Sequence, residues 1–322
     1  MSLDRPSVVD ALVVGGGPAG LSAATWLGRY RRSTVVVDAG HQRNLSADRA
    51  HGLLGRDPTT PQELLAEARA GLQQYPHVSL WQGTATTLHH VDDGLFRAVV
   101  DGADVFAQRV VLATGVRDRV PEIAGFHAHY GTDVHHCPAC DGYTARDQVV
   151  IALGTGEQLP TFAAELLDWA ARVRIITDTS GRPIDDKQRA VLDNQGIEIV
   201  DGVAEALVGA PGALLGVRLA GGELVEGDRV FFSYAHDAAN DLAEQLGCQL
   251  DHEGRLAVND FQLTSIDGVY AAGDITAGLQ LVPIAIGKGT AAGVACATSL
   301  RGHRTASAAP ALAPPARWFT AG

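Results

Sequence analysis

Cysteine is scarce in this 322-residue chain, which contains only Cys137, Cys140, Cys248 and Cys296. Four cysteines are too few for a secreted fold built on disulfides, and they suggest a reducing compartment with one special pair. Cys248 and Cys296 stand alone in the sequence and are expected to be buried thiols. Cys137 and Cys140 are separated by two residues and need a different explanation.

Basic charge and long apolar runs are also lacking. The 37 acidic residues outnumber the 25 basic ones, and the net charge of −12 gives no basic face for nucleic acid or an anionic membrane. No apolar run reaches the roughly 18 residues that span a bilayer, and Asp4, Arg5 and Asp10 interrupt the stretch that a signal peptide requires. We therefore expect a cytoplasmic protein with no nucleic-acid and no membrane partner.

The chain is rich in apolar residues, at 46%, and its length exceeds the roughly 250–300 residues at which one hydrophobic core stops growing. Two domains are therefore expected. The stretch "VVDALVVGGGPAGLSAATWLGRYRRSTVVVDAG" reads as strand, glycine turn, helix and second strand. Gly15, Gly17 and Gly20 occupy the positions of a dinucleotide-binding turn, and Asp38 is placed to accept hydrogen bonds from a ribose.

The segment "HHCPAC", residues 135–140, allows two interpretations. The cysteines could form a redox disulfide, which is the usual meaning of this spacing beside a βαβ unit in a cytosolic protein. They could instead bind zinc together with His135 and His136. Adjacent residues of an extended chain point to opposite sides, which disfavours a single tetrahedral site, and no second Cys or His cluster follows.

Three further segments carry a resemblance to a known family: "RVVLATGVRDRVPEIAGF", "DGVYAAGDIT" and "CPACDG". With the N-terminal unit, they make nearly the whole chain resemble thioredoxin-reductase-like flavoproteins. The resemblance implies an α/β fold of two Rossmann-like dinucleotide-binding domains, the second inserted into the first. Residues 1–116 and 245–322 would form the FAD domain, with 302–322 as a tail, and 117–244 the NADPH-domain-like insert. It also implies FAD contacts from Gly15, Gly17, Pro18, Ala19, Gly20, Asp38, Arg43, Asn44, His51, Thr114, Gly115, Gly273 and Asp274.

The resemblance also assigns roles around the cysteine pair. Cys140 would face the flavin, Cys137 would meet the partner disulfide, and Asp141 would supply or take the proton. The implied function is an FAD-dependent disulfide oxidoreductase that works with a thiol or disulfide protein, or with a small dithiol. A homodimer is expected from the same resemblance.

The second domain departs from the family pattern in "QVVIALGTGEQLPTF" and "IITDTSGRP". Leu159 occupies the third small-residue position of the glycine turn, where its bulk would hold the helix away from the strand. Glu157 adds a carboxylate where a pyrophosphate would sit. After the next strand come Thr177 and Asp178, instead of the arginines that would hold a 2′-phosphate. NADPH is therefore not the favoured electron donor, although Asp178 would still allow NAD(H).

Families without the NADPH signature include ferredoxin-dependent, diflavin-linked and oxygen-using disulfide oxidoreductases. The diflavin type is favoured, because a vacated site without a 2′-phosphate clamp suits a second FAD. An NAD(P)H-dependent thioredoxin reductase and a flavin- or zinc-binding sensor module are the alternatives. The Ala- and Pro-rich tail ends in Trp318 and Phe319, which could cover a flavin or dock on a partner subunit.

Overall fold

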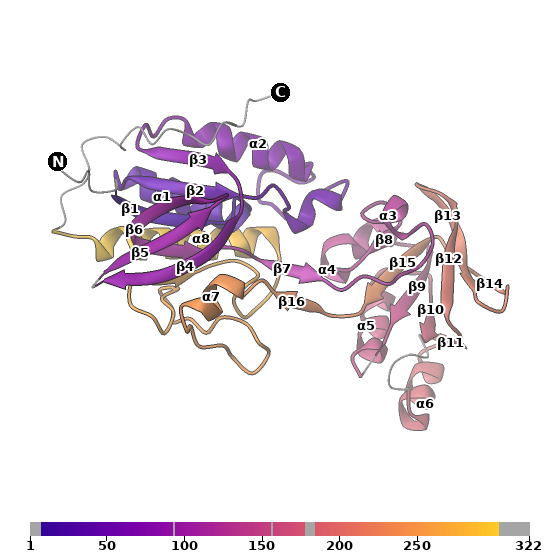
Figure 1. Ribbon diagram of the computed structural model, residues 1–322. Helices are drawn as coiled ribbons and strands as arrows, with labels where there is room; N and C mark the ends of the chain where they lie inside the picture. Colours follow the sequence, from indigo (N-terminus) through magenta and orange to yellow (C-terminus); the bar gives the residue numbers. More distant parts are fainter. Residues whose placement is uncertain (1–7, 93, 156, 178–183, 303–322) are drawn as a thin grey trace. The chain divides into compact units, whose positions relative to one another are not determined.

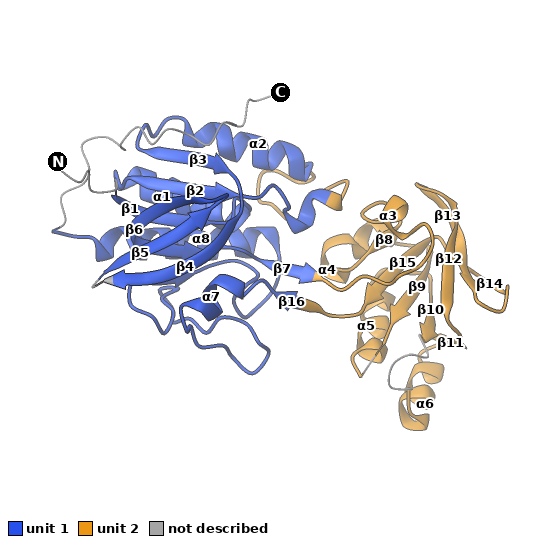
Figure 2. Cartoon of the chain, in the orientation of Figure 1, with its two compact units in different colours: residues 1–45, 59–117, 237–322 blue, residues 46–58, 118–236 orange. Residues whose placement is uncertain are grey.

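The computed structural model describes residues 8–92, 94–155, 157–177 and 184–302, and these residues form two compact units (Figures 1 and 2). Unit 1 contains the described residues of 1–45, 59–117 and 237–322, and unit 2 those of 46–58 and 118–236. The expectations for Asp178, Trp318 and Phe319 concern positions outside the described residues. Within those residues, no helix is both long and apolar enough to cross a membrane.

Unit 1 is built on a mixed seven-stranded sheet. Its strands are, in spatial order, β3 (Val78–Gln82), β2 (Thr34–Asp38), β1 (Val8–Val14), β6 (Ala103–Leu112), β5 (Leu95–Val100) and β4 (Ala85–Asp92), with β17 (Val269–Ala271) also paired to β6. Its helices are α1 (Pro18–Arg29), α2 (Pro61–Leu72), α7 (Asp241–Gln245) and α8 (Val282–Ser299), with the 3₁₀ turn η1 (Arg43–Ser46).

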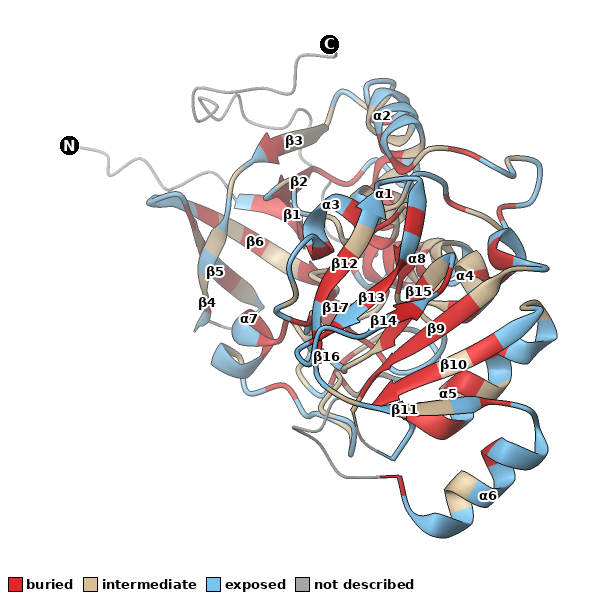
Figure 3. Ribbon diagram, turned by 90° about the vertical axis from the view of Figure 1, so that its right-hand side faces the viewer, coloured by how far each residue is buried: buried red, intermediate tan, exposed pale blue. Residues whose placement is uncertain are grey.

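Strand β1 shows why the sheet of unit 1 is buried on both faces. Ala11 and Val13 point to a cluster that includes residues of α1 and α8. Leu12 and Val14 point to the opposite cluster, which includes residues of α7. Successive side chains of a strand alternate between faces, so an uninterrupted apolar run is what a strand covered on both sides requires. In Figure 3, buried residues (red) run along β1.

Unit 2 has a five-stranded parallel sheet and a smaller antiparallel one. The parallel strands are, in spatial order, β11 (Glu198–Asp201), β10 (Arg172–Thr177), β9 (Val149–Gly154), β15 (Arg229–Ser233) and β8 (Val134–His135). The antiparallel sheet contains β12 (Ala204–Ala210), β13 (Ala213–Leu219) and β14 (Leu224–Glu226). The helices are α3 (Phe126–His129), α4 (Pro138–Asp141), α5 (Leu159–Glu165) and α6 (Asp186–Asn194), with the 3₁₀ turns η2 (Gly142–Ala145) and η3 (Leu166–Asp168).

The same alternation builds the two cores of unit 2. Val150 and Ala152 of β9 pack in a cluster with residues of α5 and α6. Ile151 and Leu153 pack in the other cluster, with residues of β12 and β13. The predicted α/β class, with a second unit inserted into the first, is thereby confirmed.

The division into units differs from the predicted domain limits in two places. The chain returns to unit 1 at 236/237, between the two ends of β16 (His236–Ala238), and not near 245. The crossing at 117/118 lies within β7 (Val116–Asp118), which pairs with β16. In addition, residues 46–58 group with unit 2, although the sequence analysis assigned them to the FAD domain. The assignment of cofactors to domains stays a prediction.

Candidate functional site

The turn between β1 and α1 has the tight geometry expected of its glycines. Gly15 adopts φ +110°, and a Cβ atom there would overlap the carbonyl oxygen of Ala113. A Cβ at Gly20 would overlap the carbonyl oxygen of Gly15. The first turn of α1 therefore packs directly on the β1 turn, which only glycine permits at these positions.

The N-terminus of α1 is open to an anionic ligand. Gly17 is the N-cap in extended conformation, Pro18 opens the helix, and neither a side-chain cap nor an acidic residue occupies the first turn. The first N–H groups of a helix have no intrahelical partner, and the helix dipole gives this end a positive potential. Because α1 is 12 residues long, its N-terminus can bind a phosphate group.

Asp38 ends β2 beside this turn and is buried. A Cβ at Gly16 would overlap the Asp38 carboxylate, so the carboxylate lies against the turn itself. Its Oδ1 accepts hydrogen bonds from the backbone N–H of Gly40 at 2.8 Å and from Nε2 of Gln42 at 2.5 Å. Its Oδ2 accepts one from Nη2 of Arg69 at 2.9 Å. Sequence reasoning missed both side-chain partners, because Arg69 comes from α2 and neither belongs to a motif.

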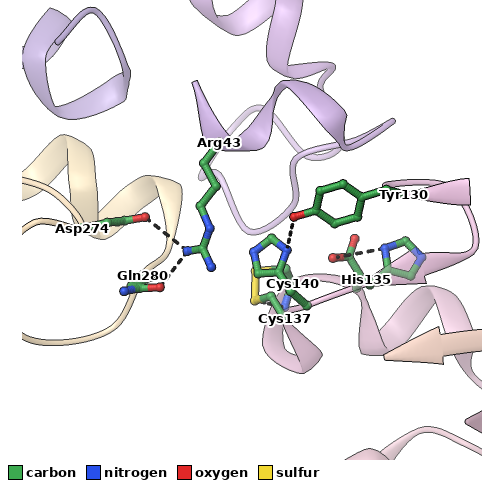
Figure 4. The surroundings of a disulfide bond; sticks show 9 residues. Arg43, Tyr130, His135, Cys137, Cys140, Asp274 and Gln280 are labelled. Carbon is green, nitrogen blue, oxygen red and sulfur yellow. Dashed lines mark hydrogen bonds and ion pairs between the residues drawn. A yellow bond between two sulfur atoms is a disulfide. The ribbon is translucent and has the colours of Figure 1, made fainter. Parts of the chain in front are cut away.

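The C-terminal Gly-Asp motif reaches the same end of α1. At Gly273, which has φ +84°, a Cβ would lie 2.8 Å from Cβ of Ala19, and a Cβ at Gly289 would overlap the carbonyl oxygen of Ala19. Arg43 in η1 lies 3.5 Å from Oδ2 of Asp274 and donates to Oε1 of Gln280 at 2.6 Å (Figure 4). The predicted residues Gly15, Gly20, Asp38, Ala19 and Gly273 thus converge within unit 1.

Three more predicted residues, Asn44, Thr114 and Gly115, belong to unit 1. Among the described residues, the buried amide nitrogen of Asn44 has no hydrogen-bond partner. The hydroxyl of Thr114 donates to the carbonyl of Ala239 at 2.8 Å, and Gly115, with φ +69°, accepts from the backbone N–H of Ala239 at 3.0 Å. These bonds fix the chain where it leaves β6.

His51 is in the part of the chain that groups with unit 2, whereas the other predicted flavin residues group with unit 1. Its Nδ1 pairs with Oδ1 of Asp57 at 2.9 Å. This hydrogen bond, together with one from the backbone N–H of Gly52, lowers the pKa of the exposed Asp57 carboxyl.

The residues of unit 1 fit an FAD molecule. The uncapped α1 N-terminus suits a pyrophosphate, the Asp38 carboxylate suits ribose hydroxyls, and the Asn44 amide is a buried donor that a ligand could satisfy.

In unit 2, Cys137 and Cys140 form a disulfide with Cα atoms 5.2 Å apart. Cys137 is the N-cap of α4, and its sulfur accepts the backbone N–H of Cys140 at 3.1 Å. The backbone N–H of Asp141 donates to the carbonyl of Cys137 at 3.1 Å, so one turn of helix holds both cysteines and the acid. A Cβ at Gly142 would approach the indole ring of Trp169 to 2.5 Å, which accounts for glycine after Asp141.

The two histidines before the disulfide have different partners. His135 is buried, its Nδ1 lies 3.5 Å from Oδ2 of Asp141, and its ring centroid is 5.3 Å from that of Phe231. Nδ1 of His136 lies 3.0 Å from the hydroxyl of Tyr130. Figure 4 shows both pairs. Within the described part of the chain, no group of three or more His, Cys, Asp or Glu residues is arranged to hold a metal ion.

The glycine turn of unit 2 differs from that of unit 1. Leu159, at the position that Gly20 has in unit 1, is the first residue of α5 and is buried. Helix α5 therefore starts two positions later in the motif than α1, which begins at Pro18, and it has only seven residues. A Cβ at Gly154 would overlap the carbonyl oxygen of Ser233 on the neighbouring strand, so this glycine is required by strand packing.

A guanidinium does lie at the carboxyl edge of β10, contrary to the sequence expectation. Arg189 of α6 donates from Nη2 to Oδ1 of Asp201 at 2.7 Å, and the hydroxyl of Thr177 donates to the same oxygen at 2.9 Å. The hydrogen bond from Arg189 lowers the pKa of Asp201, with a smaller contribution from Thr177. The charge of Arg189 is thus paired with a carboxylate.

Comparison with known proteins places this geometry among disulfide oxidoreductases. The model of the pyridine nucleotide-disulphide oxidoreductase family matches residues 9–289. The thioredoxin reductase tcpT of Claviceps purpurea is 29% identical over 320 residues, covering 92% of this chain and 96% of the relative. The crystal structure of HlmI is 32% identical, with a TM-score of 0.86, over 92% of this chain and 93% of that chain. Thioredoxin reductase from Streptococcus pyogenes, at 22% identity and TM-score 0.85 over 92% and 99% of the two chains, shares the fold.

Proposed function

Because the chain belongs to the pyridine nucleotide-disulphide oxidoreductase family and is thioredoxin-reductase-like, we propose that it exchanges electrons between FAD and the Cys137–Cys140 disulfide without NADPH. FAD supplies the redox chemistry, accepting or donating the electron pair that opens or closes the disulfide. The FAD dependence follows from the family. The independence from NADPH is inferred from the geometry of the glycine turn and the β10 edge in unit 2.

The later start of α5 is the observation that carries this proposal. In unit 1 the helix begins at Pro18, directly after the glycine turn, and points unpaired N–H groups at the phosphate position. In unit 2 the helix begins at Leu159, whose buried side chain occupies the place where Gly20 allows close packing. The short α5 therefore lacks the N-terminal phosphate site that α1 has.

The β10 edge supports the same conclusion. A 2′-phosphate, which distinguishes NADPH from NADH, is usually held by unpaired guanidinium groups. Arg189 is engaged by Asp201 at 2.7 Å, and a phosphate would have to compete with this carboxylate. The site therefore does not select for a 2′-phosphate.

The residues of unit 1 hold the flavin in this proposal. The α1 N-terminus at Gly17–Gly20 binds the pyrophosphate, Asp38 binds the ribose, and Asn44, Thr114 and Asp274 line the remainder. In unit 2, Cys137 would exchange with the partner thiol or disulfide, Cys140 would face the flavin and pass the electron pair to or from it, and Asp141 would move the proton.

In its more specific form, the proposal is that a second FAD binds in the nucleotide position of unit 2. FAD carries no 2′-phosphate, so its binding needs no unpaired guanidinium, and the pairing of Arg189 with Asp201 does not disfavour it. Acid release of flavin from the purified protein, measured against protein concentration, tests this directly. We expect two FAD per chain, and one FAD per chain would overturn this form alone.

The partner is a protein or small molecule that carries a dithiol or a disulfide, as the names of the thioredoxin reductase relatives suggest. Ferredoxin and oxygen are the two further electron partners that we propose. If either is the partner, adding it in oxidised form should reoxidise the reduced flavin. Admitting air or adding oxidised ferredoxin to the reduced protein separates them. Sedimentation equilibrium tests the proposed homodimer.

Anaerobic spectrophotometry of the holoprotein tests the main proposal. Dithiothreitol is expected to bleach the flavin absorbance, while NADPH and NADH leave it oxidised. Rapid bleaching by either nucleotide would instead identify a conventional NAD(P)H-dependent thioredoxin reductase.

Cysteine variants complete this test. Cys140→Ser is expected to abolish bleaching by dithiothreitol, because the remaining thiol cannot close the internal disulfide. Cys248→Ser serves as the control, since Cys248 is a buried thiol outside the pair. A Cys140→Ser protein that bleaches at the native rate, or a native protein without flavin, contradicts the proposal.

A further inference from the structure

His135 reaches the redox turn from a neighbouring strand. It lies on β8, is paired in register with Phe231 of β15, and is 6% exposed. Its Nδ1 lies 3.5 Å from Oδ2 of Asp141, and the Asp141 side chain is 15% exposed. Neither the disulfide motif nor the flavin motifs include this residue.

The two ring nitrogens of His135 have opposite surroundings. Nδ1 faces the Asp141 carboxylate, whereas Nε2 is buried without a hydrogen-bond partner among the described residues. A proton on Nε2 would be buried without an acceptor, so the favoured tautomer carries its proton on Nδ1. In that tautomer His135 is a hydrogen-bond donor to Asp141.

Packing fixes the donor in place. The ring of His135 lies against the fully buried Phe231, with centroids 5.3 Å apart, and the short strand β8 is held by parallel pairing with β15. The backbone of Asp141 is held in turn by its N–H bond to the carbonyl of Cys137. The free variable at this site is the side-chain orientation of Asp141, which the Nδ1–H of His135 can determine.

We infer that His135 is a positioning residue for Asp141, holding its carboxylate in the orientation from which it moves the proton of the cysteine pair. This inference rests on the proposed function, because it assumes that Asp141 serves the disulfide. The separation of 3.5 Å fits such a role, since hydrogen bonds of this kind are often long at rest and shorten when the charge changes.

The step in which Asp141 would move a proton is thiol–disulfide exchange. A thiolate of a substrate dithiol attacks one sulfur of the Cys137–Cys140 disulfide, the bond between the two sulfurs breaks, and its electron pair leaves with the other sulfur. The second substrate thiolate then resolves the mixed disulfide. Two substrate thiols become one disulfide, the protein disulfide becomes two thiols, and the two protons pass from substrate to protein. Asp141 accepts and returns a proton in this transfer, and the reverse direction uses the same groups.

The test is a double-mutant cycle on the full-length holoprotein under anaerobic conditions. Dithiothreitol is the reductant, samples are quenched with acid, and mass spectrometry counts the alkylated Cys137 and Cys140 thiols over time. This readout reports the disulfide and not the flavin. We expect Asp141→Asn to slow opening at least about tenfold. We expect His135→Phe to slow it by roughly threefold to tenfold, and to have no further effect in the Asp141→Asn background.

Conservative substitutions of His135 distinguish a role in positioning Asp141 from a role in packing. The amide nitrogen of Asn can occupy the place of Nδ1, so His135→Asn is expected to stay within about twofold of the native rate. His135→Phe keeps the ring on Phe231 but has no donor, and His135→Leu repeats the loss of the donor with a different shape. His136→Asn is the matched control, because that ring faces Tyr130. Its effect on the opening rate should be the same in the native protein and in the Asp141→Asn background.

Three results would overturn the inference. The first is equal slowing by His135→Phe with and without Asp141, and the second is His135→Asn opening as slowly as His135→Phe. A His135→Phe protein that opens at the native rate would overturn it as well. Failure of the proposed function has a different signature, since Cys140→Ser would then leave dithiothreitol bleaching of the flavin unchanged. The two failures are therefore distinguishable.

Discussion

Arg69 and the buried Asp38 form a partly buried ion pair, with Nη2 of the guanidinium 2.9 Å from Oδ2 of the carboxylate. Asp38 is the residue proposed to bind the FAD ribose, and Arg69 reaches it from α2. A single carboxylate therefore connects the end of β2, the glycine turn at Gly16 and helix α2. The proposed flavin site of unit 1 therefore depends on a helix that carries no flavin motif.

Replacing Arg69 should destabilise the protein and weaken its hold on FAD. Arg69→Met leaves the Asp38 carboxylate, whose side chain is 2% exposed, without its charged partner. The expected loss is about 2 kcal/mol in the free energy of unfolding, with faster flavin release on dilution. Urea unfolding and flavin fluorescence measure the two effects. Arg97→Met is the control, because Arg97 pairs with Asp104 at the surface; equal effects of the two substitutions would contradict the prediction.

Two glycine-to-alanine substitutions in helices should have opposite effects. In Gly20→Ala the new Cβ would overlap the carbonyl oxygen of Gly15, so α1 must move from the turn and stability should fall by about 1–3 kcal/mol. In Gly71→Ala of α2 the Cβ meets no atom of the described residues within 4 Å, and stability should rise by about 0.5–1 kcal/mol. Thermal unfolding of both variants checks the pair. No destabilisation by Gly20→Ala would contradict the close contact of Gly20 with Gly15, and destabilisation by Gly71→Ala would contradict the open surroundings of Gly71.

Features with a local cause could be predicted from the sequence. The spacing of Gly15 and Gly20 predicts a tight turn and close packing, because the constraint acts within a single turn of chain. Likewise, the apolar run of β1 predicts a strand covered on both faces. The bulk of Leu159 predicts an altered second turn for the same local reason.

Contacts between distant residues could not be predicted. Arg69 and Arg189 reach their partners Asp38 and Asp201 from other elements, and single basic residues on helices are usually solvated. His135 and Asp141 are close in sequence, but their contact depends on the pairing of β8 with β15. The grouping of residues 46–58 with unit 2 likewise depends on tertiary contacts, including the bond from the N–H of Asp48 to the carbonyl of Gly131.

The Arg189–Asp201 pair should contribute to stability at neutral pH and not in acid. Its hydrogen bond lowers the pKa of Asp201 in the folded protein. The contribution is therefore complete above the unfolded pKa of about 3.9 and is lost as the pH falls through the lower folded value. Both side chains are partly exposed, at 34% and 57%, so the gain is below about 1 kcal/mol.

Asp201→Asn tests this pair by urea unfolding at neutral pH and at a series of acidic pH values that begins below the unfolded pKa of about 3.9. The native protein should be more stable than the variant at neutral pH, and the difference should shrink steadily along the acidic series as the folded carboxyl becomes protonated. Arg189→Met should show the same convergence in acid. A difference that persists unchanged at the lowest pH would mean that the substitution acts through packing.

The four cysteines should react very unequally with iodoacetamide. Burial raises the pKa of Cys296 to about 12, and it also raises the pKa of Cys248, partly opposed by a hydrogen bond with Thr264. At a pH of about 8 the reactive thiolate of Cys296 would be roughly one part in ten thousand, and its side chain is buried as well. In native protein reduced with dithiothreitol, labelling should therefore be confined to Cys137 and Cys140, as measured by mass spectrometry of the peptides.

Without reductant, none of the four cysteines should be labelled, and urea should expose Cys248 and Cys296. Labelling of Cys296 in the native protein as fast as Cys140 would contradict the burial on which this prediction depends, because a thiol that is both protonated and enclosed cannot compete with one at a more accessible turn.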